Sequence, residues 1–283
     1  MSEFTYKVYG YTNRGPGHKV NQDSFTYKGA SFNGEPIIFA LVADGMGGTS
    51  EGEEASNEIK EAFENWFAND LKEAMENIGT GKTSLEDELD SWQTIIEHVN
   101  RSLNSRPVAY DEEGYPKAKP GTTLVAILLY AGRYYTAQIG DSRIYKKECG
   151  ELEAITKDHS WVQREIDKGA NIEDLKDSPH IHSLTRCIGA GLSDSPQVDY
   201  RAGRYGDDCG FLLCSDGFWQ TNQSNPDVLE TLSNNEIDTK DAVKKFIKYA
   251  RDKEEIDDIT AVIIKTHREE DFKCDVTEQL VAE

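Results

Sequence analysis

The chain has 283 residues, and its 31 Lys and Arg against 52 Asp and Glu give a formal net charge of −21. Hydrophobic residues make up 37% of the chain and aromatic residues 10%, which is enough for a packed core and argues against a disordered chain. The acidic composition argues against nucleic acid or an anionic membrane as a partner, because phosphate groups require a basic surface, and no stretch approaches the roughly 18 apolar residues of a membrane-spanning helix.

The N-terminal third of the chain predicts strands followed by helices. Residues 4–11 alternate in polarity, and residues 36–43 form a nearly continuous apolar run, which is typical of a strand buried on both faces. Apolar residues then recur every three to four positions over residues 54–77, which predicts a helix. After a break at 79–82, Ser84 and Asp87 fit the start of a second long helix that reaches Leu103.

The remaining two thirds predict mainly antiparallel strands. After a loop at 111–120, three short apolar segments at 124–130, 133–139 and 143–147 are separated by glycine-containing turns. The later elements that we expect are helix and loop at 160–169 and 174–178, strands at 198–202 and 211–214, a helix at about 242–250 and a strand at 259–265. We find no internal repeat and no linker that divides the chain. The sequence therefore predicts one α+β domain over residues 1–267 and a short polar tail over residues 268–283.

The five cysteines lie at positions 149, 187, 209, 214 and 274, and no two of them form a Cys-x-x-Cys pair. Their odd number and wide spacing fit neither a disulfide framework nor a tetrahedral zinc site. The N-terminus lacks a basic segment followed by an apolar one, so it does not resemble a secretion signal. We therefore expect reduced thiols and a cytoplasmic protein.

Aspartates recur at the ends of the predicted strands. Asp44 and Asp216 each follow an apolar run and precede a glycine, Asp257 directly precedes the last strand, and Asp141 lies between two strands. Two carboxylates about 4 Å apart repel by roughly 4 kcal/mol at an effective dielectric constant near 20, so a cluster of them would take up protons or hold cations. Oxygen ligands without His or Cys favour Mg²⁺ or Mn²⁺. For each Asp-Gly pair taken alone, an ordinary turn is the alternative, and the sequence does not show whether the aspartates converge.

Eight short blocks of sequence occur in a characteristic order. They are Asn-Gln-Asp-Ser at 21–24, Val-Ala-Asp-Gly-Met-Gly-Gly at 42–48, Gly-Thr-Thr at 121–123, Gln-Ile-Gly-Asp-Ser-Arg-Ile-Tyr at 138–145, Thr-Lys-Asp-His-Ser at 156–160, Leu-Thr-Arg-Cys-Ile-Gly at 184–189, Leu-Cys-Ser-Asp-Gly at 213–217 and Asp-Asp-Ile-Thr at 257–260. From about residue 11 to 265, this order resembles the metal-dependent protein serine/threonine phosphatases of the 2C type, especially their bacterial members. The resemblance implies a sandwich of two antiparallel β-sheets flanked by α-helices, which agrees with the predicted elements.

The resemblance also implies a site with two Mn²⁺ or Mg²⁺ ions. Asp44 would bridge both ions, Gly45 would offer its backbone carbonyl to one, and Asp216 and Asp257 would complete the direct ligands. Three further residues would contribute: Asp23 and, more weakly, Gln22 through metal-bound waters, and Asp141 through a third, weaker ion. In such sites, ions about 3.5–4 Å apart activate a shared water for direct attack on phosphorus, so no phosphoenzyme is needed.

The chain departs from the family pattern at two positions. His18, followed by Lys19, occupies the position of an arginine that contacts the substrate phosphate, and neither side chain offers the two-pronged contact of arginine. We expect weaker phosphate binding, with an ordinary loop residue as the alternative for His18. Met46 occupies the position at which animal relatives carry a histidine, so the proton donor could be water or a nearby histidine.

Three histidines are candidates for that donor. We expect His159 to be structural, whereas His180 and His182 fall in the segment at about 161–183 that corresponds to the mobile flap of the family. Gly79 to Thr83 superficially resembles a phosphate-binding loop, but Glu76 replaces the required first glycine and the segment follows a predicted helix. We therefore do not expect a nucleotide site.

The expected function is that of a Mn²⁺/Mg²⁺-dependent protein serine/threonine phosphatase that acts in signalling. Its partners would be proteins phosphorylated on serine or threonine, with a cognate protein kinase as a further partner, and we expect a monomer. The net charge suggests that peptides with basic flanks are favoured as substrates. The alternatives are a catalytically weak or inactive relative that binds phosphoproteins, and a hydrolase for a small phosphoester.

Overall fold

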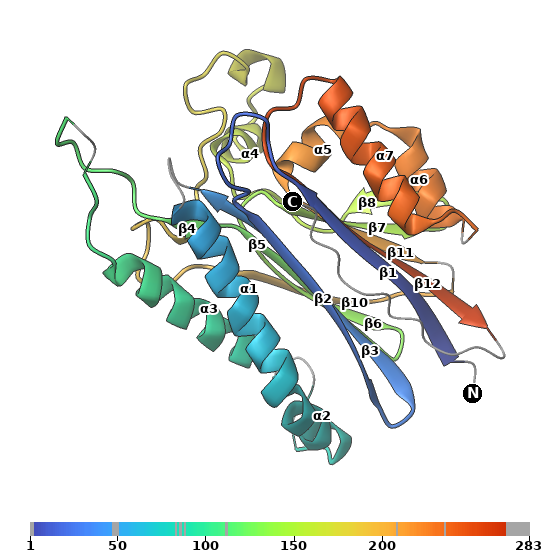
Figure 1. The fold of residues 1–283 in the computed structure, drawn as a ribbon. Coiled ribbons are helices and arrows are strands. Elements are labelled where there is room, and N and C mark those ends of the chain that lie inside the picture. Colours follow the sequence, from blue (N-terminus) through green and yellow to red (C-terminus); the bar gives the residue numbers. More distant parts are fainter. Residues whose placement is uncertain are drawn as a thin grey trace.

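The protein folds into two β-sheets that pack face to face with helices on both outer faces, as the computed structural model in Figure 1 shows. The structure describes residues 3–46, 51–82, 84, 87, 89–110, 113–207, 209–234 and 236–269. The first sheet has the order β1 (Glu3–Asn13), β12 (Ile259–Glu269), β11 (Gly210–Cys214), β7 (Arg143–Glu148) and β8 (Glu151–Ala154). The second has the order β10 (Asp199–Arg204), β6 (Arg133–Ile139), β5 (Leu124–Tyr130), β3 (Glu35–Met46), β4 (Gly121–Thr122) and β9 (Ile188–Gly189), and β2 (Asp23–Phe32) also pairs with β3. The predicted α+β sandwich is confirmed.

Strand β3 shows why an apolar run without polar alternation becomes a central strand. Successive side chains of a strand point to opposite faces of the sheet. Ile38, Ala40 and Val42 therefore enter the core between the two sheets, whereas Phe39 and Leu41 enter the core between the second sheet and its helices. Both faces of β3 are buried, so every position of the run is apolar.

The helices form the two outer layers. The second sheet is covered by α1 (Glu51–Asn69), α2 (Leu71–Gly79) and α3 (Leu89–Ser105), and the first by α5 (Asp216–Asn222), α6 (Pro226–Ser233) and α7 (Thr239–Asp252). Phe63 from α1 and Trp92 from α3 pack edge to face against each other, with ring centroids 5.4 Å apart. The segment between β8 and β9 holds α4 (Trp161–Asp167) and the short 3₁₀ helix η1 (Ile172–Leu175). Among the described residues, no helix combines the length and apolarity needed to cross a membrane.

The elements differ from the predictions where the local sequence is ambiguous. Strand β2 was not predicted, because its second half carries exposed polar and small residues. The turn that joins it to β3, Asn33-Gly34, has positive φ angles of 53° and 81°, which is the signature of a tight hairpin. The predicted helix at 54–77 is two helices that break at Asp70. Strand β8 and helices α5 and α6 were also missed.

The start of α3 agrees only in part with the prediction. The assigned helix begins at Leu89, although Ser84 and Asp87 make the expected capping contacts, with Ser84 N donating to Asp87 Oδ2 at 2.7 Å and Asp87 N donating to Ser84 Oγ at 3.2 Å. Of the segment that resembles a phosphate-binding loop, the described part ends helix α2, and Thr80 N donates to the Glu76 carbonyl. It is a helix terminus and does not follow a strand. Thr83 lies outside the described residues, as do residues 270–283.

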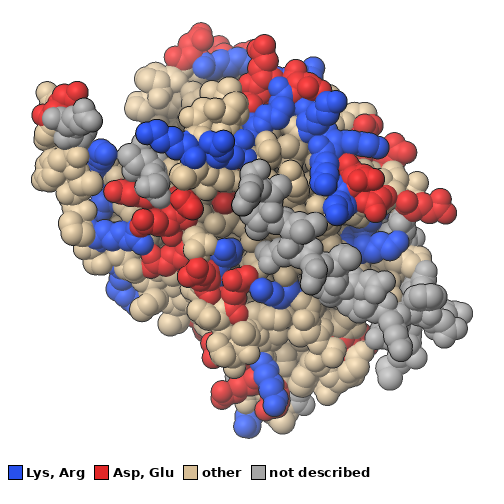
Figure 2. Space-filling view, in the orientation of Figure 1, with Lys and Arg blue, Asp and Glu red and all other residues tan. Residues whose placement is uncertain are grey.

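The net charge is unevenly distributed over the surface. Figure 2 shows acidic side chains over α1, whose first turn contains three glutamates, and Lys and Arg over α7. Four lysines of α7 are exposed: Lys240, Lys244, Lys245 and Lys248. The acidic character expected from composition therefore belongs to particular faces and not to the whole surface.

Candidate metal centre

Five aspartates meet at one edge of the sandwich, where strands of both sheets begin or end. Asp23 begins β2 and pairs directly with Asp44 near the end of β3. Asp216 follows β11, Asp257 precedes β12, and Asp141 lies in the connection between β6 and β7. Because β11 and β12 are antiparallel, the end of one and the start of the other lie side by side. The site is thus assembled from segments of both sheets that are far apart in the sequence.

Two glycines allow the backbone to approach closely at this edge. A Cβ atom added to Gly45 would lie 2.1 Å from the carbonyl oxygen of Gly52 and 2.5 Å from that of Gln22. A Cβ atom on Gly217 would lie 2.3 Å from the carbonyl oxygen of Asp258. Any other residue would push these segments apart, so each Asp-Gly pair here has a role beyond that of an ordinary turn.

The pKa values of Asp44 and Asp216 respond to the charges of the other carboxyl groups at this edge. Burial raises the pKa of Asp44 well above its usual range, and the negative charges of Asp23, Asp216, Asp257 and Asp141 raise it further. Burial also raises the pKa of Asp216 to about 6, with a further contribution from Asp257 and an opposing one from hydrogen bonding with Asp44. For Asp44 each of the leading contributions raises the pKa, and for Asp216 the contributions that raise the pKa outweigh the hydrogen bonds that lower it.

Asp23 is held from the other sheet. Ser215 Oγ donates a hydrogen bond to Asp23 Oδ2 at 2.8 Å, and Thr260 N donates to Ser215 Oγ at 3.0 Å. The side chain of Asp23 is nevertheless buried, and burial raises its pKa well above the usual range, more than these hydrogen bonds lower it. This arrangement fixes the orientation of the carboxylate and connects β2 to β11 and β12.

Asp141 completes the cluster on the side of α5. Burial, followed by the charges of Asp216 and Asp158, raises the pKa of its carboxyl group well above the usual range. The indole N–H of Trp219 donates to the Asp141 carbonyl oxygen at 3.0 Å, which fixes the backbone at this position. The Asp141 side chain is therefore carried by a loop between β6 and β7 whose backbone is fixed by a hydrogen bond.

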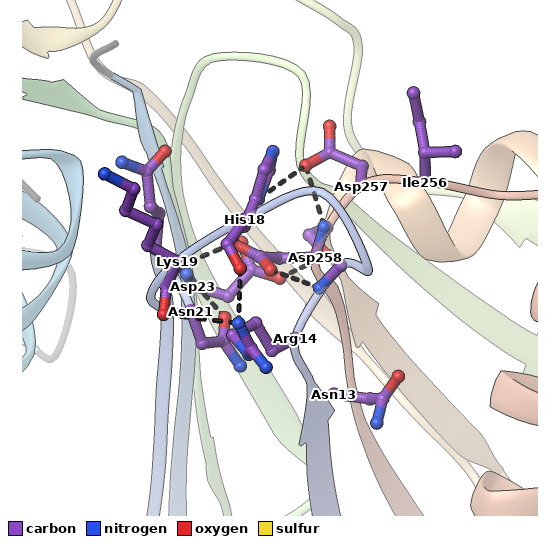
Figure 3. A network of polar contacts seen from close by, with 12 residues as sticks. Asn13, Arg14, His18, Lys19, Asn21, Asp23, Ile256, Asp257 and Asp258 are labelled. Carbon is purple, nitrogen blue, oxygen red and sulfur yellow. Dashed lines mark hydrogen bonds and ion pairs between the residues drawn. The ribbon is translucent and has the colours of Figure 1, made fainter. Parts of the chain in front are cut away.

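A second acidic group lies next to the first and is differently arranged. Figure 3 shows the His18 side chain pointing toward Asp257 and Asp258. His18 Nδ1 lies 3.0 Å from Asp258 Oδ2 and 3.9 Å from Asp257 Oδ1, contacts that are ion pairs when the ring is protonated and that lack hydrogen-bond geometry. Asp258 also accepts hydrogen bonds from Gly15 N at 2.6 Å and Gln22 N at 2.7 Å. Asp258 is thus fully partnered, and it anchors the loop that carries His18.

The donor set fits divalent cations that bind oxygen. Asp216 Oδ1 is buried and has no hydrogen-bond partner among the described residues, and such an oxygen is rare in a folded protein unless a water or an ion satisfies it. Asp44, Asp216, Asp257 and Asp141 are the residues that could hold such ions. Within the described ranges, the one group whose ligand atoms all lie within 4.8 Å of one another is His18, Asp257 and Asp258. Because both Asp258 oxygens already accept backbone N–H groups, that group is the weaker candidate.

The remaining predicted residues have distinct placements. Lys19 is exposed, and Gln22 is half-buried beside the cluster. Met46 lies at the end of β3, and the two glycines that follow it fall outside the described residues. Arg14, which sequence reasoning did not single out, donates hydrogen bonds to the carbonyl oxygens of His18 and Lys19 and so orders their loop (Figure 3).

The three candidate proton donors differ in burial and in hydrogen bonding. His159 is buried, accepts a hydrogen bond from Gly140 N at 3.2 Å and pairs with Asp199 at 3.2 Å. Burial lowers the pKa of its imidazole below the usual value. His159 is therefore structural, as predicted, whereas His180 and His182 are exposed on the segment between β8 and β9.

Two residues of the site were missed by sequence reasoning. Asp258 was treated only as part of its block, and Ser215 only as a strand residue, although both make the hydrogen bonds that position the cluster. The doubled acid of Asp257-Asp258 was an available signal, because adjacent side chains of an extended chain point in different directions and can therefore take different roles. No local signal identifies Ser215.

Comparisons with known proteins agree with this geometry. The sequence model of the family described as "Protein phosphatase 2C" matches residues 14–263. The serine/threonine phosphatase stp of Listeria monocytogenes serotype 4b (strain F2365) is 28% identical over 233 residues, which cover 82% of this chain and 84% of that protein.

Two solved structures are also similar. The serine/threonine phosphatase of S. agalactiae superposes with a TM-score of 0.75 at 24% identity, covering 93% of this chain and 100% of the other, and this likeness concerns the fold alone. The catalytic domain of the serine/threonine protein phosphatase PstP in complex with two manganese ions gives a TM-score of 0.68 at 26% identity, covering 93% and 99%. On the extent of the family match and the agreement of fold, this chain belongs to the protein phosphatase 2C family.

Proposed function

We propose that this protein is a Mn²⁺/Mg²⁺-dependent phosphatase that hydrolyses phosphoserine and phosphothreonine in proteins. The observation that carries the proposal is the set of buried and half-buried aspartates from both sheets, with an oxygen of Asp216 that has no hydrogen-bond partner among the described residues. Clustered carboxylates with raised pKa values are typical of functional sites. The sequence retains the aspartates of the family pattern, and no finding favours an inactive phosphoprotein-binding module.

The chain's own residues would divide the work as follows. Asp44, Asp216 and Asp257 would hold two ions, with the Gly45 carbonyl as a further ligand and Asp141 at a third, weaker site. Divalent ions bound there would neutralise phosphate charge and lower the pKa of water, the nucleophile. Asp23, fixed by Ser215, and Gln22 would orient water on the protein side. His18 and Lys19 would contact the substrate phosphate.

A cysteine nucleophile is not part of this proposal. Burial raises the pKa of the Cys187 and Cys209 thiols to about 12, and the thiol of Cys214 is raised by burial as well. The thiolate is the reactive form of cysteine, so these side chains are inert near neutral pH. The four described cysteines are free thiols, which supports our further proposal of a cytoplasmic location. The substrates there would be products of a protein kinase.

The test is hydrolysis of an aryl phosphate and of phosphopeptides by the purified chain, with Mn²⁺ or with a chelator. We expect activity with both substrates that is abolished by the chelator and restored by Mn²⁺. Asp216→Asn should lose this activity, whereas Asp194→Asn, which changes an exposed aspartate outside the site, should retain it. Hydrolysis that persists in the chelator would contradict the proposal. Hydrolysis of sugar phosphates alone would show that the substrate is a small phosphoester.

A further inference from the structure

A cavity of about 350 Å³ opens beside the metal centre, between helix α5 and the segment of residues 160–183. Asp141 and Asp216 line both the cavity and the candidate metal centre, so the two spaces are continuous. None of the roles proposed above uses the rest of this cavity. Its volume falls at the lower end of the roughly 300–1,000 Å³ that is usual for ligand pockets.

The outer wall of the cavity is aliphatic. Val162 and Ile166 from α4, Ile172 from η1 and Ile181 line it, and no residue of α4 is buried. Ile172 is 52% exposed. A lone exposed aliphatic side chain needs no explanation, but Ile172 and three half-buried aliphatic side chains line one cavity beside a reaction centre. Gln163, Lys176 and His182 share this wall.

The segment that carries this wall is fixed at its base. Trp161 N donates to the Ser183 carbonyl oxygen at 2.7 Å, and an isolated β-bridge joins Ser160 to Leu184. Ser160 also caps α4 by accepting a hydrogen bond from Gln163 N. The aliphatic wall therefore has a defined position relative to the metal centre.

The inner wall contains the Trp219 ring, and the two basic residues Arg143 and Lys176 that line the cavity are already paired. The Arg143 guanidinium lies 3.4 Å from the centroid of the Trp219 ring, and it makes two hydrogen bonds of 2.8 Å to the carboxylate of Asp158. Lys176, on the other wall, pairs with Glu173 at 2.5 Å. These two basic side chains are satisfied within the chain, so an acidic ligand group would have to break an existing pair to bind them.

We propose that this cavity is a subsite for an apolar side chain of the phosphoprotein substrate, at a position close to the phosphorylated residue. The inference rests on the proposed phosphatase function and adds a determinant of substrate choice to it. The continuity with Asp216 requires the occupant to lie near the phosphoryl group. The aliphatic side chains and the Trp219 ring favour a leucine, isoleucine or methionine. An acidic residue is disfavoured because Arg143 and Lys176 are paired, and a basic one because Asp141 and Asp216 are assigned to metal ions.

The test uses a series of phosphoserine peptides in an otherwise uniform background of alanine and glycine. A single leucine is moved through each position from three before to three after the phosphoserine. At one position we expect kcat/KM to exceed that of the all-alanine peptide by about tenfold or more, the usual effect of filling an apolar pocket. Lysine or glutamate at that position should remove the gain.

Variants of a cavity residue test whether the preference for leucine arises in this cavity. Ile172→Ser should bring the leucine-to-alanine ratio of kcat/KM close to one, and Ile172→Val should retain most of it. Leu192→Ser changes another exposed aliphatic residue, 57% exposed and outside the cavity, and should leave the ratio unchanged. A ratio does not depend on the fraction of folded enzyme, so instability of a variant does not obscure the result.

Two results would overturn the subsite. If the phosphopeptides are hydrolysed but leucine gives no gain at any position, or lysine is preferred, the cavity does not select apolar residues and the phosphatase function stands. If the aryl phosphate is hydrolysed but no phosphopeptide is, the proposed action on proteins is wrong, and the subsite is wrong with it.

Discussion

Asp258 and the Asp44–Asp216 pair lie at the same edge of the sandwich, but they are arranged in opposite ways. Asp258 is 2% exposed and accepts two backbone N–H groups while it contacts His18. Asp44 and Asp216 are half-buried and lie among other carboxylates. Gln220 Nε2 donates to Asp216 Oδ2 at 2.9 Å, but Asp216 Oδ1 has no hydrogen-bond partner among the described residues. The first arrangement stabilises the fold, whereas the second weakens it in the absence of a cation.

The difference separates two reasons for burying a carboxylate. A buried charge that accepts several hydrogen bonds can organise a loop, as Asp258 does for the segment that holds His18. A set of half-buried like charges whose hydrogen bonds do not offset burial and repulsion is unfavourable on its own, so its presence favours a ligand that supplies positive charge. The two groups should therefore respond in opposite ways to substitution.

The largest expected effect follows from removal of a charge in the unpartnered group. Asp44→Asn should lower phosphatase activity by at least about a thousandfold, because metal ligation contributes several kcal/mol to catalysis and about 1.4 kcal/mol corresponds to tenfold in rate. In the absence of metal, the same variant should unfold at the wild-type temperature or above it, since a repulsive charge is removed. Aryl phosphate hydrolysis and thermal unfolding in a chelator measure the two effects. A metal-free Asp44→Asn protein that is clearly less stable than wild type would contradict the comparison.

The second effect concerns the partnered group. Asp258→Ala leaves two backbone N–H donors without their acceptor, and hydrogen bonds to charged groups contribute about 1.5–3 kcal/mol each. We expect the free energy of unfolding to fall by about 3 kcal/mol, as measured by urea denaturation without metal. Asp258→Asn keeps one acceptor oxygen and should lose less. Equal stability of Asp258→Ala and wild type would show that Asp258 does not anchor the loop.

A third effect is the pH dependence of metal-free stability. The pKa of Asp216 is raised to about 6 in the folded state from an ordinary value of 3.8, so between these values the folded chain binds more protons at this site than the unfolded chain. Linkage then requires that this group increase the free energy of unfolding as the pH falls from about 7 toward 4. Comparison with Asp216→Asn isolates the contribution from other titrating groups. On acidification, the free energy of unfolding of the variant should increase less than that of the wild type. An identical pH dependence of the two proteins would contradict the raised pKa.

The smallest effect should be at His18. Its ring is 37% exposed and already contacts Asp258, so it has limited capacity for a substrate phosphate. His18→Ala should raise KM for a phosphopeptide only a few-fold, because an exposed charged contact contributes roughly 1 kcal/mol or less. His18→Arg should lower KM, since arginine binds phosphate with two parallel hydrogen bonds. An unchanged KM in His18→Ala would show that His18 is an ordinary loop residue and does not bind the substrate phosphate.

The fold could be predicted largely from sequence where burial alone dictates residue type. The continuous apolar run of β3 reflects a strand that is buried on both faces. The apolar spacing that includes Phe63 in α1 and Trp92 in α3 marks the face of each helix that packs on the second sheet. Strand β2 was missed because half of it is exposed and polar, and its place depends on pairing with β3. Propensity carries little information in such a strand.

The site could be predicted in part. Asp44, Asp216 and Asp257 were recognised as strand-end acids, but their convergence depends on the packing of two sheets. Asp23 entered only through the family resemblance. The support from Ser215 is a contact between residues 192 positions apart, which no local pattern encodes.

The most direct test of the account is a crystal structure grown with Mn²⁺, in which anomalous scattering locates the ions. We predict ions between Asp44, Asp216 and Asp257, one of them close to Asp216 Oδ1, with Asp258 still bound to the backbone of Gly15 and Gln22. Manganese held instead by His18, Asp257 and Asp258, with the Asp44–Asp216 pair unoccupied, would contradict the assignment of the two groups.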